Sequence, residues 1–150
     1  MKKILLKHPK KQSRKVVKTD IKTVLKDCQD LYRICHEATG KYPGALAMAH
    51  VQVEENEPLR FFVLNNGDII INPKIVNKED PYTHIEWCMS FAYRDKKKVK
   101  RFKKVTVECV LSSVDDKEID LSNISTIEAE GLKAAIYQHE IGHMNLDLVY

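Results

Sequence analysis

The chain has 150 residues, a length that suits one domain with one core. Hydrophobic residues make up 43% and charged residues 31%, as is typical of a soluble globular protein, and no apolar run approaches the length of a membrane-spanning helix. The net charge of +4 fits a protein that works near nucleic acid but does not by itself indicate nucleic-acid binding.

The first segment, Met1 to Val17, is basic, but its apolar stretch is too short for a secretory signal. We therefore expect a cytoplasmic protein that does not enter a membrane. In a reducing cytosol the cysteines should stay thiols, either as core residues or as metal ligands. None of the four forms a CxxC pair, which argues against a structural zinc knuckle. They are Cys28, Cys35, Cys88 and Cys109.

The first predicted element is a helix over Asp20 to Thr39, with Asp20 as N-cap and Gly40 as the stop. Its apolar residues recur at helical spacing and define one buried face. They are Ile21, Val24, Leu25, Cys28, Leu31, Tyr32 and Cys35.

Strands are predicted in the middle of the chain. After an apolar run over Ala45 to Val53, Leu59 to Leu64 and Asp68 to Ile71 form two strands around an Asn66-Gly67 turn. Because proline cannot donate to a strand ladder, Pro73 should end the second strand. Lys103 to Leu111 alternates in polarity, which predicts a half-buried strand. Its inward residues should be Val105, Val107, Cys109 and Leu111.

The last predicted elements are a short strand over Glu118 to Leu121, which pairs back, and a helix from Thr126 to Asn145. Ser125 and Glu128 have the spacing of a capping box at the start of that helix. One helix, several strands and a second helix indicate a single α+β domain over residues 1–150.

The final helix carries His139-Glu140-Ile141-Gly142-His143, the HExxH pattern. Residues four apart on a helix lie one above the other, so the two imidazoles can bind one metal ion while Glu140 reaches a bound water. Two buried histidines without a metal are the alternative, since this pattern also occurs by chance. A catalytic metal normally has three protein ligands, and the third is either Asp147 downstream or, as we favour, a residue upstream.

The upstream candidate is Cys88, in the segment Glu86-Trp87-Cys88-Met89-Ser90, which resembles the EGCLS motif of peptide deformylases. The helix segment QHEIGHMNL is similar to that family's QHEIDHLNG, and Asn72-Pro73 resembles the NP stretch that precedes the cysteine motif. These matches follow the family's order along most of the chain. The resemblance implies antiparallel β-sheets packed around a central C-terminal helix that carries HExxH. Short members of this kind include phage-encoded ones.

The resemblance implies a metal-dependent hydrolase that removes the formyl group from formyl-methionine on nascent peptides, releasing formate. Cys88, His139 and His143 would hold the metal, with Fe²⁺ expected and Zn²⁺, Ni²⁺ or Co²⁺ as substitutes. Glu140 would take the proton of water, and the backbone N–H of Met89 would stabilise the formyl oxygen. A second oxyanion donor comes from the family's GxGLAAxQ motif, whose glutamine we align with His50. Gln52 is the alternative, at the cost of a shift.

Seven residues are predicted to bind the substrate, and three of them on the last helix would line the pocket for the methionine side chain. Trp87 replaces the motif glycine and is expected to reshape the groove. Glu86 either bonds a ligand histidine or shapes the pocket mouth. The set is Ala45, Leu46, Glu86, Trp87, Leu132, Ala135 and Ile136.

Two further expectations concern partners. The basic stretch Lys96 to Lys104 is either a solvated hairpin, which we favour, or a contact to ribosomal RNA through phosphates. Because Tyr150 follows so closely after the metal helix, we expect no ribosome docking by a C-terminal helix. We expect a monomer. The competing functions are a small peptidase with the same metal chemistry and a degenerate deformylase-like module that binds metal or nascent chains without turnover.

Overall fold

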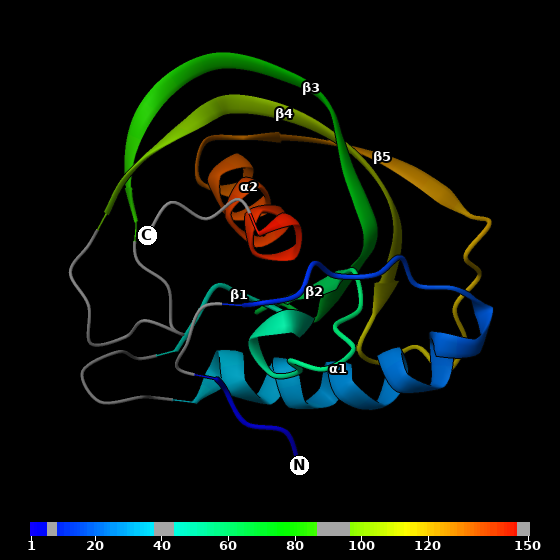
Figure 1. The fold of residues 1–150 in the computed structure, drawn as a ribbon. Coiled ribbons are helices and arrows are strands. Elements are labelled where there is room, and N and C mark those ends of the chain that lie inside the picture. The colour runs from blue at the N-terminus through cyan, green and yellow to red at the C-terminus, as the bar shows by residue number, and fades with distance from the viewer. Residues whose placement is uncertain (6–8, 38–43, 87–96, 147–150) are drawn as a thin grey trace.

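A computed structural model describes residues 1–5, 9–37, 44–86 and 97–146 (Figure 1). Its elements begin with the 3-10 turn η1 (Lys18–Asp20) and the helix α1 (Ile21–His36), and end with the helix α2 (Gly131–Asn145). Between the helices lie β1 (Ala47–Ala49), the 3-10 turn η2 (His50–Gln52), β2 (Phe61–Leu64), β3 (Asp68–Glu86), β4 (Lys97–Ser113) and β5 (Ile124–Glu130).

The five strands form one antiparallel sheet in the order β1-β2-β3-β4-β5. β3 and β4 pair over nearly their whole length, from Asp68 opposite Ser113 to Glu86 opposite Lys97. Figure 1 shows β3, β4 and β5 curving around α2, while α1 lies beyond β1 and β2 on the other side. The predicted fold class, antiparallel structure around a C-terminal helix, is confirmed, and it consists of one curled sheet.

Each helix covers its own hydrophobic core on one face of the sheet. The core on the α1 side includes Leu31, Phe61 and Ile71, and the core on the α2 side includes Phe62, Ile70 and Tyr137. Neighbouring residues such as Ile70 and Ile71 therefore point into different cores, as strand alternation requires. Since β2 and the start of β3 are buried on both faces, they form the layer that separates the two helices.

The predicted first helix is shorter than expected, because α1 ends at His36; Gly40 lies outside the described residues. Val24, Cys28, Leu31 and Cys35 are buried as predicted, and Asp27, at 2% exposure, is buried with them. Asp20 is the N-cap, but its carboxylate does not cap α1: it accepts the Val17 N–H at 2.8 Å and pairs with Arg14.

The prediction that Pro73 ends the second strand is wrong, since β3 continues to Glu86. The strand passes Pro73 through a bulge, with a register shift between Ile71 and Lys74 and a φ of 52° at Asn72. A bulge leaves a residue unpaired, so the missing proline N–H costs no ladder bond. The Asn72 side chain closes the bulge by accepting the Val16 N–H at 2.7 Å and donating to the Val16 carbonyl at 3.0 Å.

The boundaries predicted near the end of the chain are also wrong. Glu118 to Leu121 is not a strand, and Thr126 to Glu130 belongs to β5, so α2 begins at Gly131. Ile127 and Ala129 face inward between exposed glutamates, a period of two that fits a strand better than a helix. The chain turns from strand to helix at Gly131, whose φ of 60° favours glycine.

The described parts of the chain contain no helix that is both long and apolar enough to cross a bilayer. On β4, Val105, Val107 and Cys109 face inward as predicted, whereas Leu111 is 45% exposed and Val110 is buried in its place. The alternation breaks where β4 leaves α2 and reaches the α1-side core, which contains Val110.

Candidate metal centre

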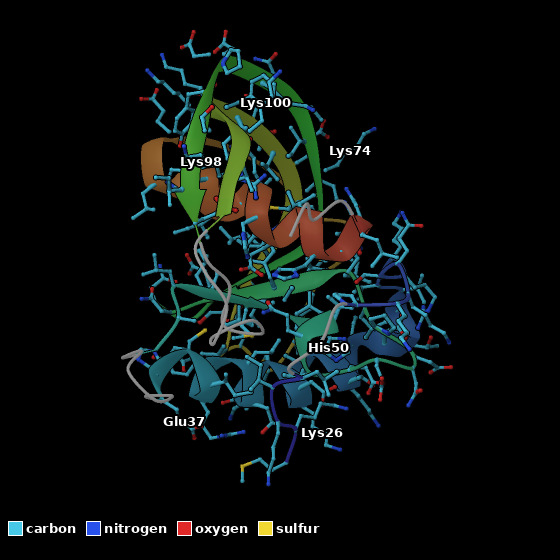
Figure 2. The ribbon with its side chains drawn as sticks, turned by 60° about the vertical axis from the view of Figure 1, so that its left-hand side comes forward. Lys26, Glu37, His50, Lys74, Lys98 and Lys100 are labelled. Carbon is cyan, nitrogen blue, oxygen red and sulfur yellow. The ribbon has the colours of Figure 1, made fainter. Side chains whose placement is uncertain are left out.

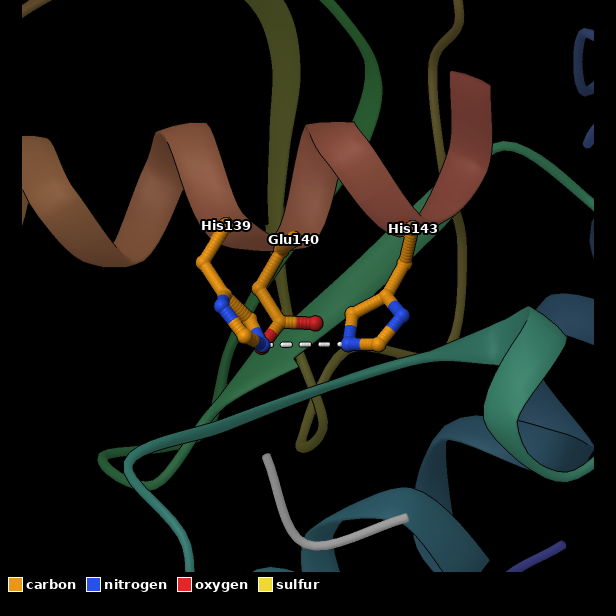
Figure 3. A group of neighbouring side chains, drawn as sticks. All are labelled: His139, Glu140 and His143. Atoms are coloured by element: carbon orange, nitrogen blue, oxygen red, sulfur yellow. Dashed lines mark hydrogen bonds between the residues drawn. The ribbon is translucent and has the colours of Figure 1, made fainter. Parts of the chain in front are cut away.

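The HExxH segment lies in the second half of α2, and its three polar side chains converge. The Nε2 atoms of His139 and His143 are 3.1 Å apart, and the ligand atoms of both histidines and Glu140 lie within 4.8 Å of one another (Figure 3). All three residues are buried, at 8% exposure or less. The helical spacing therefore does what the sequence predicted: it places two imidazoles and a carboxylate at one point.

Side-chain bonds to the backbone fix α2 against the sheet at both ends of this segment. Gln138 accepts the Phe102 N–H at 2.8 Å and donates to the Phe102 carbonyl at 2.9 Å, so it pairs with β4 as a strand would. Beyond His143, Arg60 donates to the Asn145 side chain at 2.6 Å and to the Pro73 carbonyl at 2.8 Å. The HExxH segment of α2 is thus held between β4 and the β3 bulge.

Glu86, at the end of β3, holds His139 in place. Its Oε1 lies 2.6 Å from His139 Nδ1, and Arg101 and His84 also bond the carboxylate. Burial alone would raise the pKa of Glu86, but the bonds and charges of His139, Arg101 and His84 lower it to about 2. An ionised Glu86 accepts the Nδ1 proton of His139, which leaves the lone pair of that ring on Nε2, facing His143.

These residues fit a bound cation. Two imidazole nitrogens at 3.1 Å repel each other unless a proton or a cation lies between them. Glu140 Oε2 is buried and makes no hydrogen bond within the described part of the chain. Burial raises the pKa of Glu140 to about 7, an effect that the nearby His139 partly opposes. Nitrogen and oxygen donors in this arrangement suit a divalent transition metal.

A pocket of about 610 Å³ opens beside His139 and Glu140. Its volume is in the range of small-ligand sites, which are about 300–1,000 Å³. Leu132, Ala135 and Ile136 of α2 line it, and so do Ala45 and Leu46. Glu86, His139 and Glu140 also line the pocket. The structure therefore brings together every predicted substrate-binding residue that it describes. Trp87, Cys88, Met89 and Asp147 lie outside the described residues.

His50, the predicted second oxyanion donor, does not line this pocket. Its ring lies on the α1 side, with Nε2 2.9 Å from Asp27 Oδ2 and Nδ1 accepting the Leu59 N–H at 2.9 Å. Gln52 lines the pocket instead, and its Oε1 accepts the Ala49 N–H at 2.9 Å. Because the chain leaves β1 through the 3-10 turn η2, the residue that reaches the pocket comes two positions later than we expected. A two-residue shift aligns Gln52 with the motif glutamine.

Sequence reasoning missed Arg101, which we had placed in a solvated basic stretch. Its side chain is 13% exposed and pairs with Glu86. A partial signal was its position two residues after the buried Val99, although the alternation stops at the exposed Lys103. His36, Asn65 and His84 also line the pocket and were not predicted.

The three cysteines within the described residues are free and buried. Burial raises the pKa of Cys28 and Cys109 to about 11 and that of Cys35 to about 12. They are therefore protonated core thiols at neutral pH, although Cys35 lines the pocket. None of the three belongs to a cluster of potential metal ligands among the described residues, so of the two roles left open for cysteines they have the core role.

Comparison with known proteins identifies the family. The model of the family described as Polypeptide deformylase matches residues 2–150. The chain belongs to the polypeptide deformylase family. Deformylases of this family are metal-dependent hydrolases, so the chain is an enzyme of that class. A peptide deformylase from Rhizobium meliloti (strain 1021) is 32% identical over 140 residues, which is 86% of this chain and 72% of the relative.

Solved deformylase structures share the fold. A peptide deformylase from Legionella pneumophila superposes with a TM-score of 0.73 at 26% identity, over 97% of this chain and 81% of the other. The PDF of the Vibrio parahaemolyticus bacteriophage VP16T, solved with actinonin, gives 0.70 at 26% identity, over 95% and 96%. The enzyme from Thermotoga maritima, at 23% identity and 0.73, shows the same fold over 100% and 98%.

Proposed function

We propose that this member of the deformylase family hydrolyses the N-formyl group of formyl-methionine on nascent peptides in the cytoplasm, releasing formate and a free amino terminus. The observation that carries the proposal is the convergence of His139, His143 and Glu140 at the end of a largely apolar pocket of about 610 Å³. A buried polar centre beside an apolar wall suits an amide that is attached to a methionine side chain.

The proposed metal ligands are His139, His143 and Cys88, with Fe²⁺ as the physiological ion and Zn²⁺, Ni²⁺ or Co²⁺ as substitutes. Such an ion, when bound, lowers the pKa of water toward neutrality and polarises a carbonyl oxygen. The support for the two histidines is the approach of their Nε2 atoms to 3.1 Å and the orientation of His139 by Glu86. The assignment of Cys88 as the third ligand rests on its resemblance to the cysteine of the EGCLS motif.

Glu140 is the proposed proton carrier. It takes a proton from the attacking water and hands it to the departing amine of the peptide. Its buried position beside His139 supports this role, because a carboxyl with a pKa of about 7 can both accept and return a proton at neutral pH. The water molecule supplies the oxygen that leaves in formate.

Gln52 takes the role that the sequence analysis gave to His50, as a donor to the formyl oxygen, together with the Met89 N–H. The Ala49 N–H can only donate, so the group it bonds at 2.9 Å must be the Gln52 carbonyl oxygen. The amide nitrogen of Gln52 is therefore the donor end of the side chain, in a pocket that Gln52 lines together with Glu140.

The methionine side chain is proposed to lie against Leu132, Ala135 and Ile136, whose apolar surface lines the pocket beside His139. Ala45 and Leu46 also line the pocket, and we place the peptide backbone against them. Trp87, next to Glu86, is proposed to narrow this groove and to restrict the residues that follow methionine.

Formate release from formyl-Met-Ala-Ser, by protein prepared anaerobically with Fe²⁺, tests the function. We expect turnover that falls by about 10³-fold or more in Glu140→Ala. Metal analysis of both proteins is the control, since the variant should keep its metal. No release from the metal-loaded parent chain would instead favour a module that binds metal or nascent chains without turnover.

We also propose that β4 contacts ribosomal RNA through its exposed lysines, including Lys98 and Lys100. Lys98 and Lys100 lie opposite Ile85 and Thr83 of β3, and Figure 2 shows both far from Lys26 on α1. Lys98→Glu with Lys100→Glu should lower the slope of log affinity against log salt by about 2 in ribosome co-sedimentation. The matched control is Lys22→Glu with Lys26→Glu on α1. Equal behaviour of the two pairs, or no binding at low salt, would remove this contact.

A further inference from the structure

We propose that His50 and Asp27 are a buried positioning pair that holds the η2 turn, and with it Gln52, in place. The proposal rests on the function given to Gln52 above. Figure 2 shows His50 beside α1, below the sheet and away from α2. His50 and Asp27 are 1% and 2% exposed, and neither lines the pocket beside the metal helix.

The hydrogen bonds of the pair define one protonation state of the ring. The Leu59 backbone N–H donates to His50 Nδ1 at 2.9 Å, so Nδ1 must be the acceptor. The ring proton is then on Nε2, which donates to Asp27 Oδ2 at 2.9 Å. The ring also stacks on Phe61, with centroids 4.7 Å apart. His50 is therefore neutral and is bonded to α1 on one side and to the segment before β2 on the other.

The pair is costly to bury, which argues that it does more than fill space. A carboxylate withdrawn from water needs partners, and Asp27 has His50 and, at 3.9 Å, Lys2 Nζ. The neighbouring residues of the same turn, Ala49 and Val51, are buried and apolar, so the site could have accepted an apolar side chain. What the polar pair adds is direction, because two hydrogen bonds on one ring fix both its position and its orientation.

The turn connects this anchor to the pocket. His50 is the first residue of η2 and Gln52 is the last. The His50 carbonyl accepts the N–H groups of Val53 and Glu54, both at 3.0 Å, which closes the turn around the anchored residue. The Gln52 carbonyl accepts the Leu5 N–H at 2.8 Å. A displacement of about 1 Å in a positioning element can cost about 10²-fold in rate, so the anchor bears on catalysis without touching substrate.

Amide hydrogen exchange tests the anchor without needing activity. The probe is the Ala49 N–H, which donates to Gln52 Oε1, and the reference is the Ile70 N–H in the doubly buried strand β3. His50→Leu should accelerate exchange at Ala49 by about 10-fold or more relative to Ile70. His50→Gln, which keeps a donor and an acceptor, should stay within about threefold of the parent. Asp27→Ala removes the same bond from α1 and should act like His50→Leu. Equal acceleration at both amides, or none at Ala49, would overturn the proposal.

Kinetics on the Fe²⁺ enzyme then test whether the anchor acts through Gln52. His50→Leu should lower kcat about 10-fold or more with KM within about twofold, and should cost less than about twofold in a Gln52→Ala background. Equal losses in both backgrounds would mean a general structural role and would overturn the proposal. If the parent enzyme releases no formate, the proposed function fails, while the exchange experiment still decides whether the pair positions the turn.

Discussion

Within the described residues, a buried histidine–carboxylate pair lies on each side of the sheet. On the α2 side, His139 Nδ1 lies 2.6 Å from Glu86, and on the α1 side, His50 Nε2 lies 2.9 Å from Asp27. The pairs differ in what the second ring nitrogen meets. For His139 it is another imidazole nitrogen, from His143, whereas for His50 it is a backbone N–H. The second nitrogen, and not the carboxylate, therefore separates the proposed metal ligand from the proposed structural anchor.

The two carboxylates also differ in their surroundings. Glu86 faces a pocket and is bonded by His139, Arg101 and His84, which keep it ionised beside a site for a cation. Asp27 lies on α1 and faces His50 of η2 and the first residues of the chain, where Lys2 approaches it. The first pair can thus orient a ligand toward an open space, and the second joins two elements that are already packed.

The largest expected effect is a loss of bound metal in a variant of the α2-side site, with none in a variant of the α1-side pair. His143→Ala removes one of the two facing nitrogens, so the purified protein should hold less than about one tenth of the metal of the parent. His50→Leu, which also removes a buried imidazole, should leave the metal content unchanged. Elemental analysis after identical Fe²⁺ loading measures both. Loss of metal in His50→Leu would show that the second pair is not merely an anchor.

The next effect separates Gln52 from the residue that anchors its turn. Gln52→Leu should lower kcat by about 10²–10³-fold, the usual cost of removing one oxyanion donor, with metal content unchanged. The reduction should exceed that of His50→Leu, because an anchor acts only through the group that it positions. Steady-state formate release measures both variants. A greater loss in His50→Leu than in Gln52→Leu would reverse the assignment of the two residues.

A smaller change in metal affinity is expected when the two carboxylates are neutralised one at a time. Glu86→Gln weakens the acceptor of the His139 Nδ1 proton and should reduce metal affinity by about 10–100-fold, as is usual for partners of ligand histidines. Asp27→Asn makes the same chemical change in the other pair and should leave metal affinity within about threefold. Competition with a chelator of known affinity gives both values. Similar losses in the two variants would contradict the division between ligand and anchor.

The sequence predicted this chemistry where a regular element determined the geometry. HExxH on a helix needs only the 3.6-residue period to bring His139 and His143 together, and that prediction needed no tertiary information. The location of His50 depended on where β1 ends and on a 3-10 turn of three residues, which no period in the sequence marks. The prediction that Pro73 ends a strand failed for a related reason. The strand continues through a bulge at which the Asn72 side chain bonds the Val16 backbone, and no period in the sequence marks that bulge. Arg101 was missed because it lies within a run of lysines, which predicts a solvated stretch.

The smallest expected effect concerns the charges around Asp27. Lys2 bonds Glu54 at 2.6 Å and lowers the pKa of that carboxyl from 4.5 to about 2. A carboxyl with a lowered pKa in the folded state adds stability at pH values above 4.5, and this stability is lost as the pH falls toward 2. Because the pair is partly exposed, Glu54→Gln should cost about 1 kcal/mol at pH 7, and less at pH 3, in urea unfolding. Glu57→Gln, an exposed carboxylate of the same turn, should show almost no change at either pH. A cost for Glu54→Gln that is the same at both pH values would mean that the loss comes from packing and that Lys2 does not stabilise this side of the molecule through its charge.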